Sequence, residues 1–274
     1  MSGTLLNKAK IIAKLGASRT ALGRSFLINR SISSSKSQIH PFDIQYRVRT
    51  GGLIPQYLLN PKQKLSDIME NQAHPYFGCS PNCLRAALNR MSVNSDTIFL
   101  DLGCGMGRAA IVASEFNFGE IIGVEISKEL CVIARRNAKI IQENFPERPS
   151  IEIINCDARR LEIKPANTVA FMYNPFGPDL IKDIVRKFDR TLEAGYYVAI
   201  IYENPTYFSA IDSSEHFSRC FGLQVKCSDA ERIHMFDDDE AVAVWHSDKI
   251  MNSWRAEFDV KIVTAGTRAE VVVK

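Results

Sequence analysis

The residues best suited to chemistry surround a glycine-rich stretch, Thr97–Gly107, with the sequence TIFLDLGCGMG. Asp101 comes first, and Gly103, Gly105 and Gly107 follow it at alternate positions. Glycine lets the backbone turn tightly and lets a ligand approach without a Cβ in the way. A carboxylate before such a turn repels a pyrophosphate but attracts an ammonium group. The G-x-G-x-G spacing differs from the G-x-G-x-x-G of dinucleotide enzymes, and the acid before it favours a ligand with an ammonium group.

Two more acids stand where predicted strands end. Glu125 closes the strand Glu120–Glu125, 18 residues beyond Gly107, and its carboxylate can accept hydrogen bonds from both hydroxyls of a ribose. Asp157 closes a strand over 150–157 and can accept a hydrogen bond from an adenine amino group. Two structural alternatives stay open: Glu125 as an acid at a helix start, and Asp157 as a turn residue that caps the next segment.

The sequence Asn174-Pro175-Phe176 follows another predicted strand, Thr168–Tyr173. The side-chain carbonyl of Asn174 and the backbone carbonyl of Pro175 can hold an amine nucleophile in line for attack. Phe176 can stack on a flat acceptor. The alternative is a plain turn from strand to helix, with the proline at the helix start.

The elements that must position these residues alternate between strand and helix. Short apolar runs predict five strands, and their hydrophobic periodicity separates them from the helices. The strands cover residues 98–100, 120–125, 150–157, 168–173 and 195–202, and two further segments, 222–234 and 240–246, form a predicted antiparallel pair. Helices are predicted after the N-cap residue Ser127 and over Pro178–Leu192. This alternation predicts an α/β sheet whose ligands bind outside the carboxyl ends of its strands.

Composition places the chain among globular proteins. It has 274 residues, 46% hydrophobic and 24% charged, which suits one α/β domain with an extension. No apolar run approaches the roughly 18 residues that span a bilayer. The seven cysteines are scattered without a Cys-x-x-Cys pair, which favours free thiols in a reducing compartment. The acids in 234–240 predict a solvated hairpin turn, so no metal site is expected.

The basic character of the chain belongs to its N-terminus, where residues 1–42 hold seven Lys or Arg and no acid. Three interpretations compete for this segment: an amphipathic helix packed on the domain, an organelle transit peptide within residues 1–37, or a basic surface for an anionic partner such as a membrane or nucleic acid. The serine-rich stretch Ser31–Ser37 predicts a flexible link. We expect a cytoplasmic protein, with organelle targeting as the alternative.

The stretch 97–202 resembles the class I S-adenosylmethionine methyltransferases. DLGCGMG looks like their motif I, Glu125 like the ribose acid, Asp157 like the acid beside the adenine, and YNPF like the motif after the fourth strand. The resemblance implies a Rossmann-like three-layer sandwich, with a seven-stranded, mostly parallel sheet and one antiparallel strand near the C-terminus. It also implies S-adenosyl-L-methionine as the cofactor. The predicted cofactor-binding residues are Asp101, Gly103, Cys104, Gly105, Gly107, Glu125, Ile126, Asp157, Ala158 and Asn174, and the predicted catalytic residues are Asn174, Pro175 and Phe176.

The resemblance leaves the methyl acceptor open. Residues 43–91 look similar to bacterial methyltransferase-domain proteins of undefined acceptor, and their order is also similar to that of lysine methyltransferases acting on the ATP-synthase c subunit. YNPF instead looks more like the motif of amino-group methyltransferases of nucleic acid or glutamine, although it lacks their second proline. We expect a nitrogen nucleophile, a protein lysine or another amine. The alternatives are a nucleic-acid or small-molecule acceptor, or a non-catalytic module that binds S-adenosylmethionine.

The same comparison divides the chain into four regions: a basic N-terminal segment at 1–38, a cap at 39–92, the methyltransferase domain at 93–248, and a C-terminal extension at 249–274. The aromatic segment 74–81 precedes a helix predicted over 82–91. Its aromatic side chains either cover a ligand at motif I or belong to a packed connecting loop.

Overall fold

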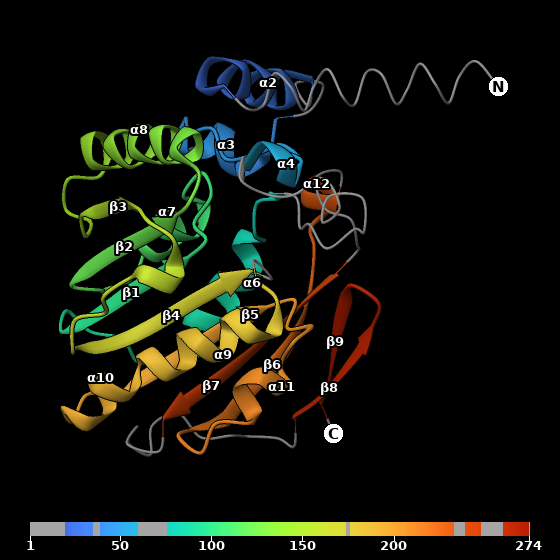
Figure 1. The fold of residues 1–274 in the computed structure, drawn as a ribbon. Helices are drawn as coiled ribbons and strands as arrows, with labels where there is room; N and C mark the ends of the chain where they lie inside the picture. Colours follow the sequence, from blue (N-terminus) through green and yellow to red (C-terminus); the bar gives the residue numbers. More distant parts are fainter. Residues whose placement is uncertain are drawn as a thin grey trace.

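The computed structural model describes residues 20–34, 39–59, 76–173, 176–232, 239–247 and 260–273. Within them, seven strands form one twisted sheet in the order β3-β2-β1-β4-β5-β7-β6, with helices on both of its faces (Figure 1). The strands are β1 Thr97–Leu102, β2 Glu120–Glu125, β3 Ile151–Asn155, β4 Asn167–Tyr173, β5 Val198–Glu203, β6 Phe217–Lys226 and β7 Asp239–Ser247. Strand β7 runs antiparallel to both β5 and β6, and the other neighbours are parallel. The predicted fold class is therefore confirmed.

The central strands are buried on both faces, as their unbroken apolar sequences require. Every residue of β5 is buried, and so is nearly every residue of β1 and β4. Several strand predictions differ from the structure at their ends. The strand predicted over 150–157 spans Ile151–Asn155, so Asp157 follows the strand. The strand predicted from Gly195 begins at Val198, because Gly195 has φ 89° and belongs to the preceding turn. The strand predicted over 222–234 begins earlier, at Phe217, and ends at Lys226.

Two layers of helices cover the sheet. One layer holds α6 Pro81–Leu88, α7 Arg108–Ala113 and α8 Lys128–Asn144, and side chains of α6 and α7 pack with Phe99, Phe171 and Ile201 of the sheet. The other holds α9 Pro178–Lys187, α10 Asp189–Glu193 and α11 Ser209–Asp212. The single helix predicted over Pro178–Leu192 is thus two helices, which meet at the buried Phe188.

Helix α2, Ala21–Ser34, packs on the domain beside α3 Pro41–Tyr46 and α4 Gln56–Leu59 (Figure 1). Ile28 is 1% exposed and shares a cluster with Met106 and Leu130, while Arg24 forms an ion pair of 3.1 Å with Glu129 of α8. The predicted serine-rich link is wrong as far as Ser34, because the helix continues to that residue. For residues 20–34 the structure agrees with the packed-helix interpretation. Residues 1–19 and 35–38 lie outside the described residues.

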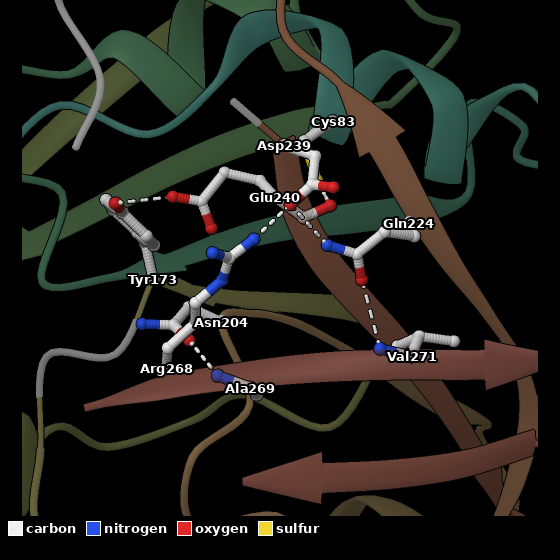
Figure 2. A network of polar contacts seen from close by, with 9 residues as sticks. All are labelled: Cys83, Tyr173, Asn204, Gln224, Asp239, Glu240, Arg268, Ala269 and Val271. Atoms are coloured by element: carbon white, nitrogen blue, oxygen red, sulfur yellow. Dashed lines mark hydrogen bonds and ion pairs between the residues drawn. The ribbon is translucent and has the colours of Figure 1, made fainter. Parts of the chain in front are cut away.

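A separate hairpin of β8 Val260–Ala265 and β9 Arg268–Val273 follows the sheet in sequence. It is fastened by polar contacts (Figure 2): the Asn204 amide oxygen accepts from the Ala269 N–H at 2.8 Å, and the Gln224 amide oxygen accepts from the Val271 N–H at 3.0 Å. Arg268 also pairs with Asp239 at the start of β7. None of the helices described is both long enough and apolar enough to cross a bilayer.

Candidate donor site at the glycine turn

The glycine turn after β1 has a backbone that only glycine adopts easily. Gly105 has φ 55°, and Gly103 and Gly107 also lie in the left-handed region. The N–H groups of Gly103 and Cys104 donate to the Val124 carbonyl at 2.9 and 3.0 Å, which ties the turn to the end of β2. The turn therefore presents its backbone at the carboxyl edge of the sheet, where open α/β sheets bind their ligands.

Asp101 lies at this edge as a buried carboxyl group with an unused oxygen. Asp101 is 2% exposed, and its Oδ2 has no hydrogen-bond partner among the residues that the structure describes. Burial raises the pKa of Asp101 from an ordinary value of 3.8 to about 8, the Ala110 amide opposes the shift, and the nearby Glu125 carboxylate adds to it. An unpaired buried carboxyl group costs free energy that a cation can offset. The site thus suits an ammonium group.

Glu125 connects the glycine turn to the start of α8. Its two carboxylate oxygens accept from the Gly105 N–H at 3.0 Å and from the Ser127 N–H at 2.8 Å. Burial raises the pKa of Glu125, and these amides oppose the shift. Ser127 caps α8 through its hydroxyl, as predicted. A carboxylate oxygen accepts more than one hydrogen bond, so Glu125 can hold the turn and still accept from a ribose hydroxyl.

Ile126 follows Glu125 and is 47% exposed. The Asn155 amide donates to the carbonyls of Glu125 and Ile126 at 2.9 and 3.0 Å, so the backbone here is held in place. An exposed apolar side chain on a fixed backbone provides an apolar contact for a ring such as adenine.

Asp157 lies at the next strand end, but its carboxylate already has partners. It caps the 3₁₀ turn η1 Ala158–Arg160 and forms an ion pair of 2.6 Å with Arg159. Its pKa is lowered, first by the hydrogen bond from Arg159. This arrangement agrees with the turn-cap alternative, and an adenine contact would have to share the carboxylate with Arg159. Ala158 is buried beside it.

The predicted catalytic residues are only partly described. Asn174 and Pro175 lie outside the described residues. Phe176 is half-buried and packs against the apolar cluster on the α9 side of the sheet. That packing accounts for Phe176 without an acceptor.

The cap supplies residues that the sequence analysis did not single out. The Tyr76 ring lies against the turn so closely that a Cβ built on Gly105 would stand 2.0 Å from a ring carbon. The Tyr76 hydroxyl donates to the Thr50 carbonyl at 2.7 Å, and the buried Arg108 donates to the Thr50 hydroxyl at 2.8 Å and to the Cys79 carbonyl at 3.0 Å. The sequence analysis left segment 74–81 either as a cover over a ligand at motif I or as a packed loop, and the direct packing of Tyr76 on Gly105 agrees with the packed-loop alternative.

Strands β5 and β7 hold two further buried acids that the sequence analysis did not single out. Glu203, at the end of β5, is 0% exposed, and its Oε1 accepts from the Ser80 N–H at 2.7 Å. Glu240, on β7, is 8% exposed and accepts from the Tyr173 hydroxyl at 3.2 Å (Figure 2). A sequence signal was present for Glu203, which directly follows the strand predicted over 195–202.

Comparisons with known proteins agree with this arrangement. Residues 99–195 match a family model described as a methyltransferase domain. The H3 lysine-79-specific histone-lysine N-methyltransferase of Dictyostelium discoideum is 28% identical over 146 residues, which are 50% of this chain and 8% of that protein. This chain therefore spans a small part of the length of that curated relative.

Solved structures of similar fold include an RNA methyltransferase of Salinibacter ruber in complex with S-adenosyl-L-homocysteine, at 17% identity and a TM-score of 0.43, covering 64% of this chain and 97% of that one. A precorrin-8w decarboxylase of Methanobacterium thermoautotrophicum is 13% identical with a TM-score of 0.46, covering 63% and 92%. Scores at this level do not decide between functions. The family match is more informative about the site, because the matched residues include the glycine turn and both Glu125 and Asp157.

Proposed function

We propose that this chain, whose residues 99–195 match a methyltransferase domain, is a class I S-adenosylmethionine-dependent methyltransferase that transfers the methyl group to a nitrogen nucleophile, a protein lysine or another amine. The matched domain supports the class of enzyme and its donor. The residues that bind the donor, and the nature of the acceptor, are our proposals.

The observation that carries the donor site is the buried and unpartnered oxygen of Asp101 beside the glycine turn. The amino-acid end of S-adenosylmethionine carries an ammonium group, and a carboxylate that lacks a cation is its natural partner. Glu125 would accept from the ribose hydroxyls and Ile126 would contact the adenine. The residues present therefore fit the donor, from its ammonium group to its base.

The donor brings its own reactivity, since its sulfonium centre makes the methyl group ready for transfer. The protein must bind the two substrates, align them and exclude water. Tyr76 helps to exclude water, because its ring covers Gly105 and its hydroxyl donates a hydrogen bond to the Thr50 carbonyl. Asn174 and Pro175 follow β4 in the sequence, and we keep them as proposed partners of the acceptor amine.

A nitrogen acceptor is supported by one comparison. The curated relative is named as a lysine methyltransferase, although the shared part is 8% of its length. Nucleic-acid and small-molecule acceptors are outcomes that the following experiment separates.

Calorimetry of the purified protein should show binding of S-adenosylmethionine and S-adenosylhomocysteine, but not of NAD. Asp101→Asn should weaken both, and the exposed Asp96→Asn should leave both unchanged. Incubation with radiolabelled donor and a fractionated cell extract should place the label in amine groups. Tight binding of NAD, or a protein that binds the donor but labels nothing in any fraction, would refute the proposal.

A further inference from the structure

Tyr173, Glu203 and Glu240 form a row across three neighbouring strands, and we refer to these residues as the acid row. Tyr173 of β4 is the register partner of Glu203 of β5, and Glu203 is the partner of Val242 of β7. Alternate residues of a strand share a face, so Glu240 lies on the same face as Val242. The acid row is thus built by regular strand pairing rather than by a loop.

The acid row faces the same side of the sheet as Asp101. Phe99, Phe171 and Ile201 stand two residues before Asp101, Tyr173 and Glu203, and all three belong to the apolar cluster under α6 and α7. Neighbouring strands lie about 4.8 Å apart, and the sheet order is β1-β4-β5-β7. Asp101 and Glu203 therefore stand on either side of the end of β4.

The hydrogen bond from the Ser80 N–H explains only one of the two carboxylate oxygens of Glu203. Its Oε1 accepts from the Ser80 N–H at the start of α6, but its Oε2 has no hydrogen-bond partner in the part of the chain that the structure describes. Glu203 is 0% exposed, so this oxygen has lost its water as well. Accepting one backbone N–H does not require a carboxylate, since an amide oxygen would serve. The second oxygen is unexplained without a ligand.

Burial disfavours the ionised form of the groups in the acid row. Burial first and then the neighbouring Glu240 raise the pKa of Glu203 well above its ordinary value, and Arg108 lowers it. Arg108 directs its guanidinium hydrogen bonds to Thr50 and Cys79, not to this carboxyl group. Burial and Glu240 also raise the pKa of Tyr173. A ligand that brings a positive charge would stabilise the carboxylates.

We propose that Glu203 and Glu240, with the Tyr173 hydroxyl, bind the methyl acceptor as the ammonium form of an aliphatic amine. Transfer needs the nitrogen lone pair, so the ammonium would first give one proton to the unpartnered Oε2 of Glu203. The freed nitrogen would then form the new N–C bond, and the donor sulfur would keep the electron pair of the broken C–S bond. The inference rests on the proposed function and makes it narrower. Two buried carboxyl groups select a cation, so they disfavour an amide or a nucleobase, which are neutral, and they repel the phosphates of a nucleic acid. The ammonium of the donor would lie at Asp101 and that of the acceptor at the acid row, with the end of β4 between them.

The amine can come from a lysine side chain of a protein or from a small diffusible molecule, and both present the same group to Glu203. A test that does not need the natural acceptor uses two stable analogues of the donor. In each, a nitrogen replaces the sulfonium centre and the methyl group is extended into an alkyl chain. The chain ends in an amine in one analogue and in a methyl group in the other.

Calorimetry with the full-length protein should show that the amine analogue binds at least about tenfold more tightly than its alkyl twin, the gain of about one charge-assisted hydrogen bond. Glu203→Gln and Glu240→Gln should each reduce this preference to about twofold or less, with little change in the affinity of the alkyl analogue. Glu231→Gln should keep the preference, because Glu231 is also buried but bonds to Ser228 and Asn82.

The outcomes separate the two proposals. If neither analogue binds the wild-type protein, the donor site and the proposed function are wrong. If both bind equally well, or if the preference survives in both Gln variants, the acid row does not bind the acceptor while the proposed function stands. The labelling experiment identifies the source of the amine, in protein or in small molecules. Label in an amide or a nucleobase would overturn the inference.

Discussion

Asp101→Asn should stabilise the empty protein while it weakens donor binding. The buried carboxyl group of Asp101 has its pKa raised from 3.8 to about 8, and each unit corresponds to about 1.36 kcal/mol. At neutral pH the unfolded chain releases this proton and the folded protein retains it, so the group lowers the free energy of unfolding by roughly 4 kcal/mol. The new amide also bears a burial cost, so we expect a net gain of about 1–3 kcal/mol from the substitution.

The sign of the pH dependence follows from the same shift. A carboxyl group whose pKa is raised by folding destabilises the protein progressively as the pH rises from its ordinary pKa toward about 8. The difference in unfolding free energy between Asp101→Asn and wild type should therefore grow over this window and level off above it. Because Glu125 raises the pKa of Asp101 and Asp101 raises that of Glu203, the difference reports Asp101 together with its coupling to these two acids.

Denaturant unfolding at a series of pH values measures this difference, and calorimetry with S-adenosylhomocysteine measures the binding. Above about pH 8, where Asp101 is already a carboxylate, loss of the charge-assisted bond to the donor ammonium should weaken binding by about 1.5–3 kcal/mol, or roughly ten- to a hundredfold. Asp96→Asn, at an exposed position, should change neither quantity. A variant that is less stable than wild type above neutral pH, or that binds the donor equally well, would show that Asp101 is a structural residue instead.

Three further predictions concern the turn, the N-terminal helix and the chemistry. Gly105→Ala should lower the melting temperature, because its φ of 55° costs a residue with a Cβ about 1 kcal/mol and the Tyr76 ring must move; an unchanged melting temperature would contradict the packing of Tyr76. Deleting residues 1–34 should lower it by exposing the partners of Ile28, whereas deletion of residues 1–19 alone is the control. Asn174→Ala should reduce kcat by about a hundredfold with little change in donor affinity, and a wild-type rate would exclude amine positioning by Asn174.

The glycine turn and its acids were predictable because their information is local. Strand β2 has the bounds predicted for it, and Ser127 caps α8 as expected. Both depend on hydrophobic periodicity and on residue types within a few positions of each other. The acid before G-x-G-x-G likewise indicated an ammonium ligand from neighbours in the sequence alone.

Element boundaries were less certain where tertiary packing overrides local preference. The helix predicted through Leu192 ends at Lys187 and a second one follows, because Phe188 turns into the core between them. The serine-rich stretch is helical as far as Ser34, in a helix anchored by Ile28 and the Arg24–Glu129 ion pair. Composition alone favoured a link there.

The sequence by itself determined the order of the elements, the class of the domain and the strand ends at which Asp101 and Glu125 stand. Only the tertiary structure placed Tyr76 on Gly105, and only strand pairing put Glu203 beside Tyr173. These contacts join residues that are far apart in the chain, and no local periodicity encodes which distant backbone will pair with which. A glutamate at a strand end becomes informative once burial removes its water and leaves one oxygen without a partner, and burial is decided by the whole fold.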